Sequence, residues 1–463
     1  MASSKDSFNT SITMQKNYIQ TQEDRLPSTN PIKRQESITS IETTAGQITR
    51  RVFQILFYFH LIIITVLVIF LTIHGLLSAA HENHDHHHQF HPRKWYPPLL
   101  TSVVSAGIVA FTWQWITGYN PLKALKAAFW LSPLLTFSVG ILLILIGSAG
   151  GIAIGAIAVV SALIQSLYSC WVNPRFDYAT QILSVAMDFY PARTIVLVIL
   201  SILIGTLYSC FLVSGIGGAT ASGTGLDALF ISIILLSLAG TMHVIKNTLL
   251  VTISRVKYWH FVCGADMDIC AAFRDTIKYC MGSVCIGSTI VPILAVIRGS
   301  ARALKLMAGD RDEFLFSCAD CYSGVASTLV TYGNRWGFVY VGVYNKGFVQ
   351  GSSDAWRMFS MGELETLIDS DLTGSLCFLF GVAGGAICSL MSGTWAFAIH
   401  ENHATEVSIY GFLIGYFICR IALAWPQACV SAYYVAYAEN PQNPRFDSTI
   451  PVRIQELRRY HQV

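Results

Sequence analysis

Residues 52–80 form an apolar run that contains no Asp, Glu, Lys or Arg. A helix needs about 20 consecutive apolar residues to cross the hydrocarbon core of a bilayer, and a helix in a soluble core seldom has so many. Comparable runs recur along the chain as far as residue 438. The sequence therefore predicts an all-α, polytopic membrane protein, whose function involves the bilayer or something that crosses it.

The apolar runs predict about ten transmembrane helices, the eighth of which contains Asn334 and Arg335. The composition agrees, since 53% of the residues are hydrophobic, 12% are charged and the mean hydropathy is +0.51. Soluble domains carry about twice that charged fraction. The predicted spans are 52–80, 97–119, 128–147, 150–171, 194–214, 226–250, 281–298, 322–346, 372–397 and 406–438.

Three regions are expected along the chain. Residues 1–49 are polar, lack an apolar period and are expected to be a disordered cytosolic tail, whereas 50–440 form the transmembrane domain and 441–463 a cytosolic C-terminal tail. The net charge of +3 gives no indication of a nucleic-acid partner. The expected surroundings are the lipid bilayer, and the sequence does not indicate an oligomeric state.

Lys and Arg in the short loops predict the orientation, because these residues concentrate on the cytosolic side. Their positions place both termini and the loop 172–193 in the cytosol. The segment after the seventh span conflicts with this rule, since it should lie outside yet is basic. Segment 281–346 is therefore either a pair of crossings or a re-entrant hairpin. The basic residues concerned are Arg298, Arg302, Lys305 and Arg311.

Aromatic residues recur every fourth position in the predicted eighth span, at Tyr332, Trp336, Tyr340, Tyr344 and Phe348. In a helix this spacing places the rings along one side. Aromatic faces attract cations, and a cage of them is a common site for a quaternary ammonium. The alternative is that the rings only pack or form an interfacial belt. Glycines beside them would let a neighbouring backbone approach closely: Gly333, Gly337 and Gly342.

Two further spans offer tryptophans for a central path. Trp113 and Trp115 are two residues apart and do not share a helix face, so at most one of them faces inward. Trp115 suits the interfacial belt near the cytosolic end. A polar group, with Asn334 as the candidate, would bind a substrate hydroxyl. The predicted substrate-binding residues are Trp113, Trp130, Asn334, Trp336, Tyr340 and Tyr344.

The segment 81–91 holds six of the thirteen histidines. Imidazole clusters bind Zn or Cu, but no matching set of His and carboxylate ligands faces across the predicted spans. We therefore expect a flexible exoplasmic segment and no metal in the substrate site. The sequence also lacks a Walker motif and a nucleophile elbow, so neither an enzyme nor a cofactor is expected.

Several motifs in residues 270–440 resemble the choline-transporter-like family of polytopic membrane proteins. The order and spacing of these motifs match the family, whereas the first half of the chain is similar mainly in hydropathy. The short His-rich loop after the first span is similar to the plant and fungal branch. The motifs are Thr276–Ser288, Asn334–Phe338 through Tyr344, Asp371–Cys377 and Tyr434–Pro441, with Val244–Asn247 matching more weakly.

The resemblance implies ten spans, cytosolic termini and choline-like substrates. Trp336 and Phe338 depart from the family pattern, in which a polar residue and a Tyr are usual. We expect a facilitative or secondary carrier for choline or a related organic cation, with an aromatic cavity at the membrane midplane. The plasma membrane is the expected location, with an endomembrane as the alternative. Two rival functions stay open, namely a non-transporting factor in lipid homeostasis or vesicle traffic and a metal-ion carrier that uses the His tract.

Overall fold

The protein is described by a computed structural model that covers residues 44–80, 92–188, 192–220, 226–308, 335–361, 364, 367, 370–399 and 403–461. The chain divides into two units, Met1–Gln47 and Ile48–Val463, and the bundle described below belongs to the second. The His tract at 81–91 and the predicted site residue Asn334 lie outside the described residues.

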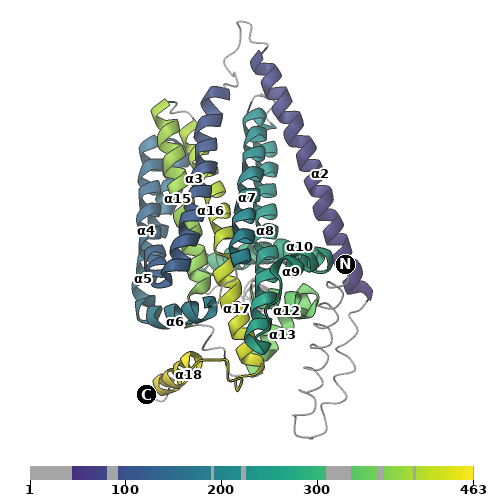
Figure 1. Ribbon diagram of the computed structural model, residues 1–463. Helices are drawn as coiled ribbons and strands as arrows, with labels where there is room; N and C mark the ends of the chain where they lie inside the picture. Colours follow the sequence, from purple (N-terminus) through teal and green to yellow (C-terminus); the bar gives the residue numbers. More distant parts are fainter. Residues whose placement is uncertain are drawn as a thin grey trace. The chain divides into compact units, whose positions relative to one another are not determined.

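Every regular element in these described ranges is a helix (Figure 1). The long helices are α2 (Thr44–Ala80), α3 (Pro92–Tyr119), α4 (Pro121–Ile146), α5 (Ala149–Val172), α7 (Ala192–Ala219), α8 (Asp227–Cys263), α10 (Met281–Ala308), α15 (Thr373–Ile399) and α16 (Ala404–Ala422). The shorter ones are η3 (Asn173–Arg175), α6 (Phe176–Met187), α9 (Ile269–Asp275), the π-helical turn η4 (Thr276–Cys280), α12 (Trp336–Tyr344), α13 (Phe348–Met361), α17 (Ala424–Glu439) and α18 (Thr449–His461).

Within the described part of the chain, nine helices are long and apolar enough to cross a membrane. They coincide with nine of the predicted spans, so the prediction of a polytopic all-α membrane protein is confirmed. The predicted eighth span, 322–346, is wrong as a continuous helix. Its described part is α12, which starts after the non-helical Arg335 (φ −143°) and ends at Asn345 (φ 53°). Nine residues extend about 14 Å, far short of a hydrocarbon core of about 30 Å.

The predicted tenth span, 406–438, is two helices rather than one. The break is at Leu423, between α16 and α17, three residues before Pro426. A proline ring clashes with the carbonyl four residues earlier and its nitrogen has no hydrogen to donate, so a continuous helix is disfavoured here. The Pro426 kink expected from the sequence is therefore a helix break.

The hairpin between α4 and α5 shows how local sequence sets the helix ends. Asn120 caps α4 by accepting a hydrogen bond from the backbone N–H of Lys123 at 3.0 Å, and Pro121 occupies the first turn. Gly147, with φ 77°, ends α4 in the left-handed conformation that glycine adopts without strain. The Ser148 side chain then caps α5 through the N–H of Gly151. The two helices are therefore antiparallel neighbours with a tight connection.

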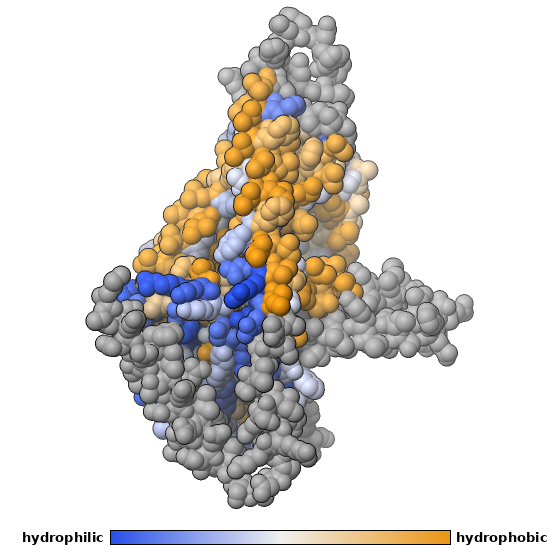
Figure 2. Space-filling view, turned by 90° about the vertical axis from the view of Figure 1, so that its right-hand side faces the viewer, coloured by the Kyte–Doolittle hydropathy of each residue, from blue (hydrophilic) through white to orange (hydrophobic). Residues whose placement is uncertain are grey.

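Two helices show opposite patterns of burial. On α2, large apolar side chains such as Ile62, Val66 and Leu77 are exposed, and Figure 2 shows hydrophobic residues gathered on the face of the molecule that carries this helix. Such an exposed apolar surface is stable in contact with lipid. On α17 every residue from Ala424 to Tyr437 is buried, as expected for a helix that is apolar all round. Helix α2 therefore suits a position facing the lipid, and α17 is an interior helix.

On one side of the bundle, α15 packs on α3, α4 and α16, while α3 also packs on α7. On the other side, α8 packs on α7 and continues along α17 and α12 (Figure 1). The interior helix α17 contacts α6, α8, α12 and α13. The lower half of α8, with α12, α13 and α17, makes a group of packed helices that we call the lower bundle. It contains the candidate site.

Candidate functional site

The aromatic ribbon predicted along the eighth span divides into two parts on α12. Trp336 is fully buried, with its ring 5.0 Å from that of Phe359 and 5.4 Å from that of Tyr434. Tyr340 and Tyr344 instead lie side by side, with ring centroids 5.6 Å apart. Phe348 belongs to α13 and packs on Phe338, and Tyr332 lies outside the described residues. Among the described residues of the ribbon, Tyr340 and Tyr344 are the two that reach a polar cluster.

That cluster is built around the carboxylate of Glu439, the last residue of α17. The Tyr344 hydroxyl donates a hydrogen bond to its Oε2 at 2.8 Å, and the Tyr258 hydroxyl of α8 donates a second, shorter one to the same oxygen. The two hydroxyls lie 2.7 Å apart. Helices α8, α12 and α17 thus bring together one carboxylate, Tyr258 and Tyr344. Tyr340, beside Tyr344, is the third tyrosine. We call these four residues the Glu439 cluster.

Burial raises the pKa of Glu439 above its ordinary value, and hydrogen bonds from the tyrosine hydroxyls oppose part of that rise. Desolvation acts against the charged form, and the positive charge of Lys346 also opposes only part of the rise. A cation placed next to Glu439 would therefore gain more attraction than it would beside a carboxylate in water.

A cation of the chain itself already lies against two rings of the cluster. The Lys346 ammonium is 5.5 Å from the ring centroid of Tyr344 and 5.8 Å from that of Tyr340. Its Nζ also donates to Asp354 at 2.7 Å. These distances are within the range of cation–π attraction. The rings of Tyr340 and Tyr344 are therefore placed to attract an ammonium group, and that of Lys346 already occupies this position.

The turn between Tyr344 and Lys346 is held in place by contacts from α2, η4 and α10. Asn345 adopts a left-handed conformation that few residues other than glycine and asparagine tolerate. Its carbonyl accepts from Arg50 at 3.1 Å, and its side-chain oxygen accepts from the thiol of Cys280 at 3.6 Å. Ser283 donates to the carbonyl of Lys346 at 3.4 Å. This turn fixes the side chains on both sides of it.

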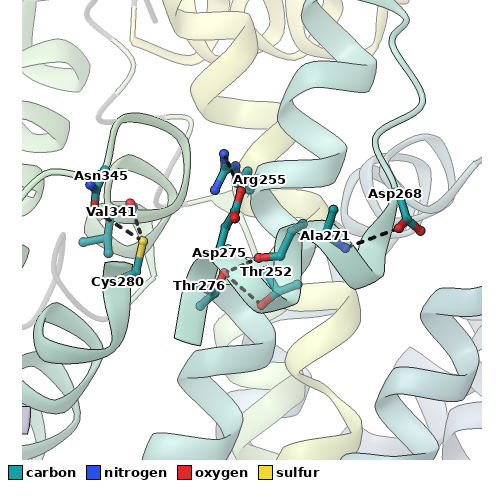
Figure 3. A network of polar contacts seen from close by, with 10 residues as sticks. Thr252, Arg255, Asp268, Ala271, Asp275, Thr276, Cys280, Val341 and Asn345 are labelled. Atoms are coloured by element: carbon teal, nitrogen blue, oxygen red, sulfur yellow. Dashed lines mark hydrogen bonds and ion pairs between the residues drawn. The ribbon is translucent and has the colours of Figure 1, made fainter. Parts of the chain in front are cut away.

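Figure 3 shows how the α9–η4 region joins this turn to α8. Arg255 of α8 pairs with Asp275 at 3.4 Å, and Thr252 donates to Thr276 at 3.2 Å. At the other end of η4, the thiol of Cys280 reaches the carbonyl of Val341 on α12. The first family-like motif begins at Thr276, so this motif connects α8 with the helix that carries the tyrosines.

A buried ion pair joins the start of α12 to the start of α15. Arg335 pairs with Asp371, whose side chain is 1% exposed, and the guanidinium carbon lies 4.3 Å from the ring centroid of Trp336. Asp371 also accepts from the backbone N–H and the hydroxyl of Thr373, at 3.1 and 2.6 Å. Because Tyr434 packs on Trp336, segments of three family-like motifs meet here. They position the Glu439 cluster.

The structure brings Tyr340 and Tyr344 into one site and places Trp113, Trp130 and Trp336 elsewhere, while Asn334 lies outside the described residues. Trp336 packs beside the cluster, as described above. Trp113 is stacked on Phe380 of α15 at 4.4 Å. Trp130 is half exposed on α4, on a surface that suits lipid contact. A substrate-binding role for Trp113, Trp130 or Asn334 stays a prediction.

Glu439 and Tyr258 were missed by reasoning from sequence. Glu439 lies inside the motif Tyr434–Pro441, at the point where an apolar run ends. A carboxylate at such a position is typical of a helix end that is exposed to solvent. Tyr258 follows two basic residues and gives no signal of its own. Only the packing of α8 against α17 reveals that both side chains face α12.

The depth of the cluster differs from the midplane position expected from the sequence. Tyr258 lies about 46 Å along α8 from Asp227, at about 1.5 Å per residue. A hydrocarbon core is about 30 Å thick. A helix that enters the bilayer near Asp227 has therefore left the core before Tyr258. The cluster lies toward the membrane boundary, on the side that Lys and Arg predict to be cytosolic.

The fold and this site define a multi-pass α-helical membrane protein with an anionic, tyrosine-rich cluster among broken helices. The family described as plasma-membrane choline transporter matches residues 156–442, which is more than half of the chain and includes α8, α12 and α17. The chain therefore belongs to the plasma-membrane choline transporter family.

Individual relatives are distant. Protein PNS1 of Debaryomyces hansenii is 26% identical over 344 residues, which cover 66% of this chain and 67% of that protein. Protein PNS1 of Yarrowia lipolytica is 25% identical over 307 residues, covering 55% of this chain and 54% of the relative. A CTL-like protein of Dictyostelium discoideum is 22% identical over 214 residues, covering 43% and 37%. The aligned regions thus span from about a third to two thirds of these relatives.

Proposed function

We propose that the protein carries choline or a related quaternary-ammonium cation across a membrane, and that the Glu439 cluster binds the cationic group. The observation that supports this best is the carboxylate of Glu439 with Tyr258, Tyr340 and Tyr344 around it. A quaternary ammonium cannot donate a hydrogen bond, so a protein binds it through aromatic faces and a nearby negative charge. Both are present in the cluster, and each well-placed desolvated ring contributes about 2 kcal/mol.

The broken helices around the cluster support a carrier that changes conformation. The chain breaks at Leu423, before α17, and at Asn345, after α12, and both of these helices carry cluster residues. Secondary transporters commonly bind substrates and ions at discontinuous helices, around which the rest of the bundle rocks. The sequence has no nucleotide-binding motif, so we propose facilitative or secondary transport rather than an ATP-driven pump, and no enzymatic activity.

The binding step is tested by the effect of choline on thermal stability in purified protein, because a ligand that binds the native state raises its stability. We expect Glu439→Gln to raise the choline concentration needed for stabilisation about ten- to a hundredfold. This corresponds to the loss of about 1.5–3 kcal/mol for an interaction with a charged group.

Glu406→Gln is the matched control, since Glu406 is an exposed carboxylate in the first turn of α16. It should leave the choline response unchanged. Equal responses of Glu439→Gln and the wild type would reject the Glu439 cluster as the cation site.

A further inference from the structure

A cavity of about 400 Å³ lies between α3, α6, α7 and α17, apart from the Glu439 cluster. This volume is within the range of about 300–1,000 Å³ usual for small-molecule sites. The described residues around it are all uncharged. The ones that matter here are Phe111, Gln114, Trp115, Tyr119, Ile199 and Trp425.

Gln114 is the polar residue that distinguishes this cavity. It is only 6% exposed, and neither its amide nitrogen nor its amide oxygen has a hydrogen-bond partner among the described residues. Leaving a buried amide without partners costs about 1–3 kcal/mol. Because the amide both donates and accepts, a single hydroxyl group placed in the cavity can satisfy one atom of each kind.

Aromatic rings make up much of the rest of the wall. Phe111, Trp115 and Tyr119 follow one another at four-residue intervals along α3, so they share one face of that helix. Trp115 is 71% exposed and Tyr119 is 85% exposed, whereas Trp425 of α17 is buried. Rings that are still accessible can receive a ligand without rearrangement of the core. Their faces attract a cation that has lost its water.

We infer that this cavity is a second site for the cation of the proposed carrier, specific for a quaternary ammonium that bears a free hydroxyl group. The amide of Gln114 binds the hydroxyl, and the rings of Trp115, Tyr119 and Trp425 face the ammonium. This inference rests on the proposed function. It adds a residue, Gln114, that distinguishes quaternary ammonium ions with a hydroxyl group from those without one.

The uncharged wall restricts the ligand further. A quaternary ammonium with a carboxylate would need a cationic partner in the wall, and the described lining offers none. A choline phospholipid has its hydroxyl esterified, so it cannot donate a hydrogen bond to the Gln114 amide. The small free cation therefore suits the cavity better than either alternative.

The two sites are joined by one helix. Trp425 stands at the start of α17 and Glu439 at its end, about 21 Å apart at about 1.5 Å per residue. The cavity and the Glu439 cluster thus lie at opposite ends of one buried helix.

The test compares choline with tetramethylammonium, which lacks the hydroxyl, as stabilising ligands of the purified full-length chain. Measurements in the Glu439→Gln variant isolate the cavity. In this variant we expect choline to act at about fivefold lower concentration than tetramethylammonium, and Gln114→Leu to reduce that preference to less than about twofold. Trp115→Ala should weaken the binding of both ions and leave their ratio unchanged.

Thr117→Val is the matched control, because Thr117 is a buried polar residue of the same helix outside the cavity lining. It should keep the fivefold preference. A preference that persists in Gln114→Leu, or a Glu439→Gln protein that does not respond to choline while the wild type does, would overturn the second site alone. A wild-type protein that shows no response to choline would overturn the proposed function as well.

Discussion

Glu439 is the residue on which the proposed chemistry depends most. Its carboxylate accepts hydrogen bonds from two tyrosine hydroxyls and still has a raised pKa, because burial outweighs these bonds. A bound cation would relieve part of this cost by adding its attraction to that of Lys346. The same residue would be a poor choice for structure alone, since a neutral glutamine could accept the same two bonds without the cost of desolvating a charge.

The raised pKa of Glu439 predicts a pH dependence of choline binding. Only the ionised carboxylate attracts the cation, and choline keeps its charge at every pH. As the pH falls through the raised pKa, the carboxylate becomes protonated and affinity is lost. The loss should therefore begin above about pH 4.3, the ordinary value for glutamate.

Equilibrium binding of labelled choline between pH 4 and 8 would measure this dependence, with Glu439→Gln as the control that should lose it. An affinity in the wild type that stays constant down to about pH 4.3 would contradict the role given to this carboxylate.

Lys346 gives a second prediction at the scale of single residues. Its ammonium lies 5.5 Å from the ring centroid of Tyr344, so it occupies a face that the substrate would use and repels a second cation. Lys346→Met should therefore raise choline affinity about two- to fivefold, equivalent to about 0.5–1 kcal/mol. Lys278→Met is the control, since Lys278 lies 5.0 Å from the ring centroid of Tyr279 outside the cluster. A loss of affinity in Lys346→Met would mean that this lysine organises the site instead.

Among the elements, α12 is the one whose placement decides whether the site exists. Gly342 lets it approach α8, because a Cβ at this position would lie 2.6 Å from the carbonyl oxygen of Val251. The facing atom is backbone and cannot turn away. Gly337 and Gly342, two of the glycines beside the aromatic ribbon, thus allow the close approach of neighbouring helices.

Gly342→Ala should destabilise the protein by about 1–3 kcal/mol, the usual cost of an overpacked contact. Gly240→Ala on α8 is the matched control, because no atom lies within 4 Å of a Cβ at that position. It should stabilise the protein by about 0.5–1 kcal/mol, as alanine does in a helix. Unfolding in detergent by chemical denaturant measures both changes. If the two variants were equally stable, the close packing of α12 on α8 would be refuted.

The helix breaks mark the limit of what the sequence reveals about elements. Apolar length predicts the membrane helices well, because crossing a bilayer demands a long uninterrupted run. The same criterion joined α16 to α17 and predicted one continuous helix for 322–346, which is broken at Arg335. Leu423 is as apolar as its neighbours, and a window average conceals the single polar residue Asn345, so hydropathy reveals neither break. Pro426 was the one residue in the sequence that indicated a break near Leu423.

For the molecule as a whole, the sequence predicted the class of fold and the family, and it found half of the proposed cation cluster. Tyr340 and Tyr344 were found because their periodicity is local. Glu439 and Tyr258 were not, because they meet α12 only through contacts between residues far apart in the chain. The depth of the cluster likewise depends on how far α8 extends past the bilayer, and a hydropathy profile does not contain that information.

The central claim concerns flux, so its most direct test is uptake of radiolabelled choline by proteoliposomes that contain the purified chain. The account predicts saturable uptake above that of empty liposomes, reduced about tenfold or more at low choline concentration by Glu439→Gln and unchanged by Glu406→Gln. Uptake of labelled zinc, measured in the same proteoliposomes, tests the alternative of a metal-ion carrier. Choline uptake equal to that of empty liposomes, with the protein shown to be folded and inserted, would contradict the account.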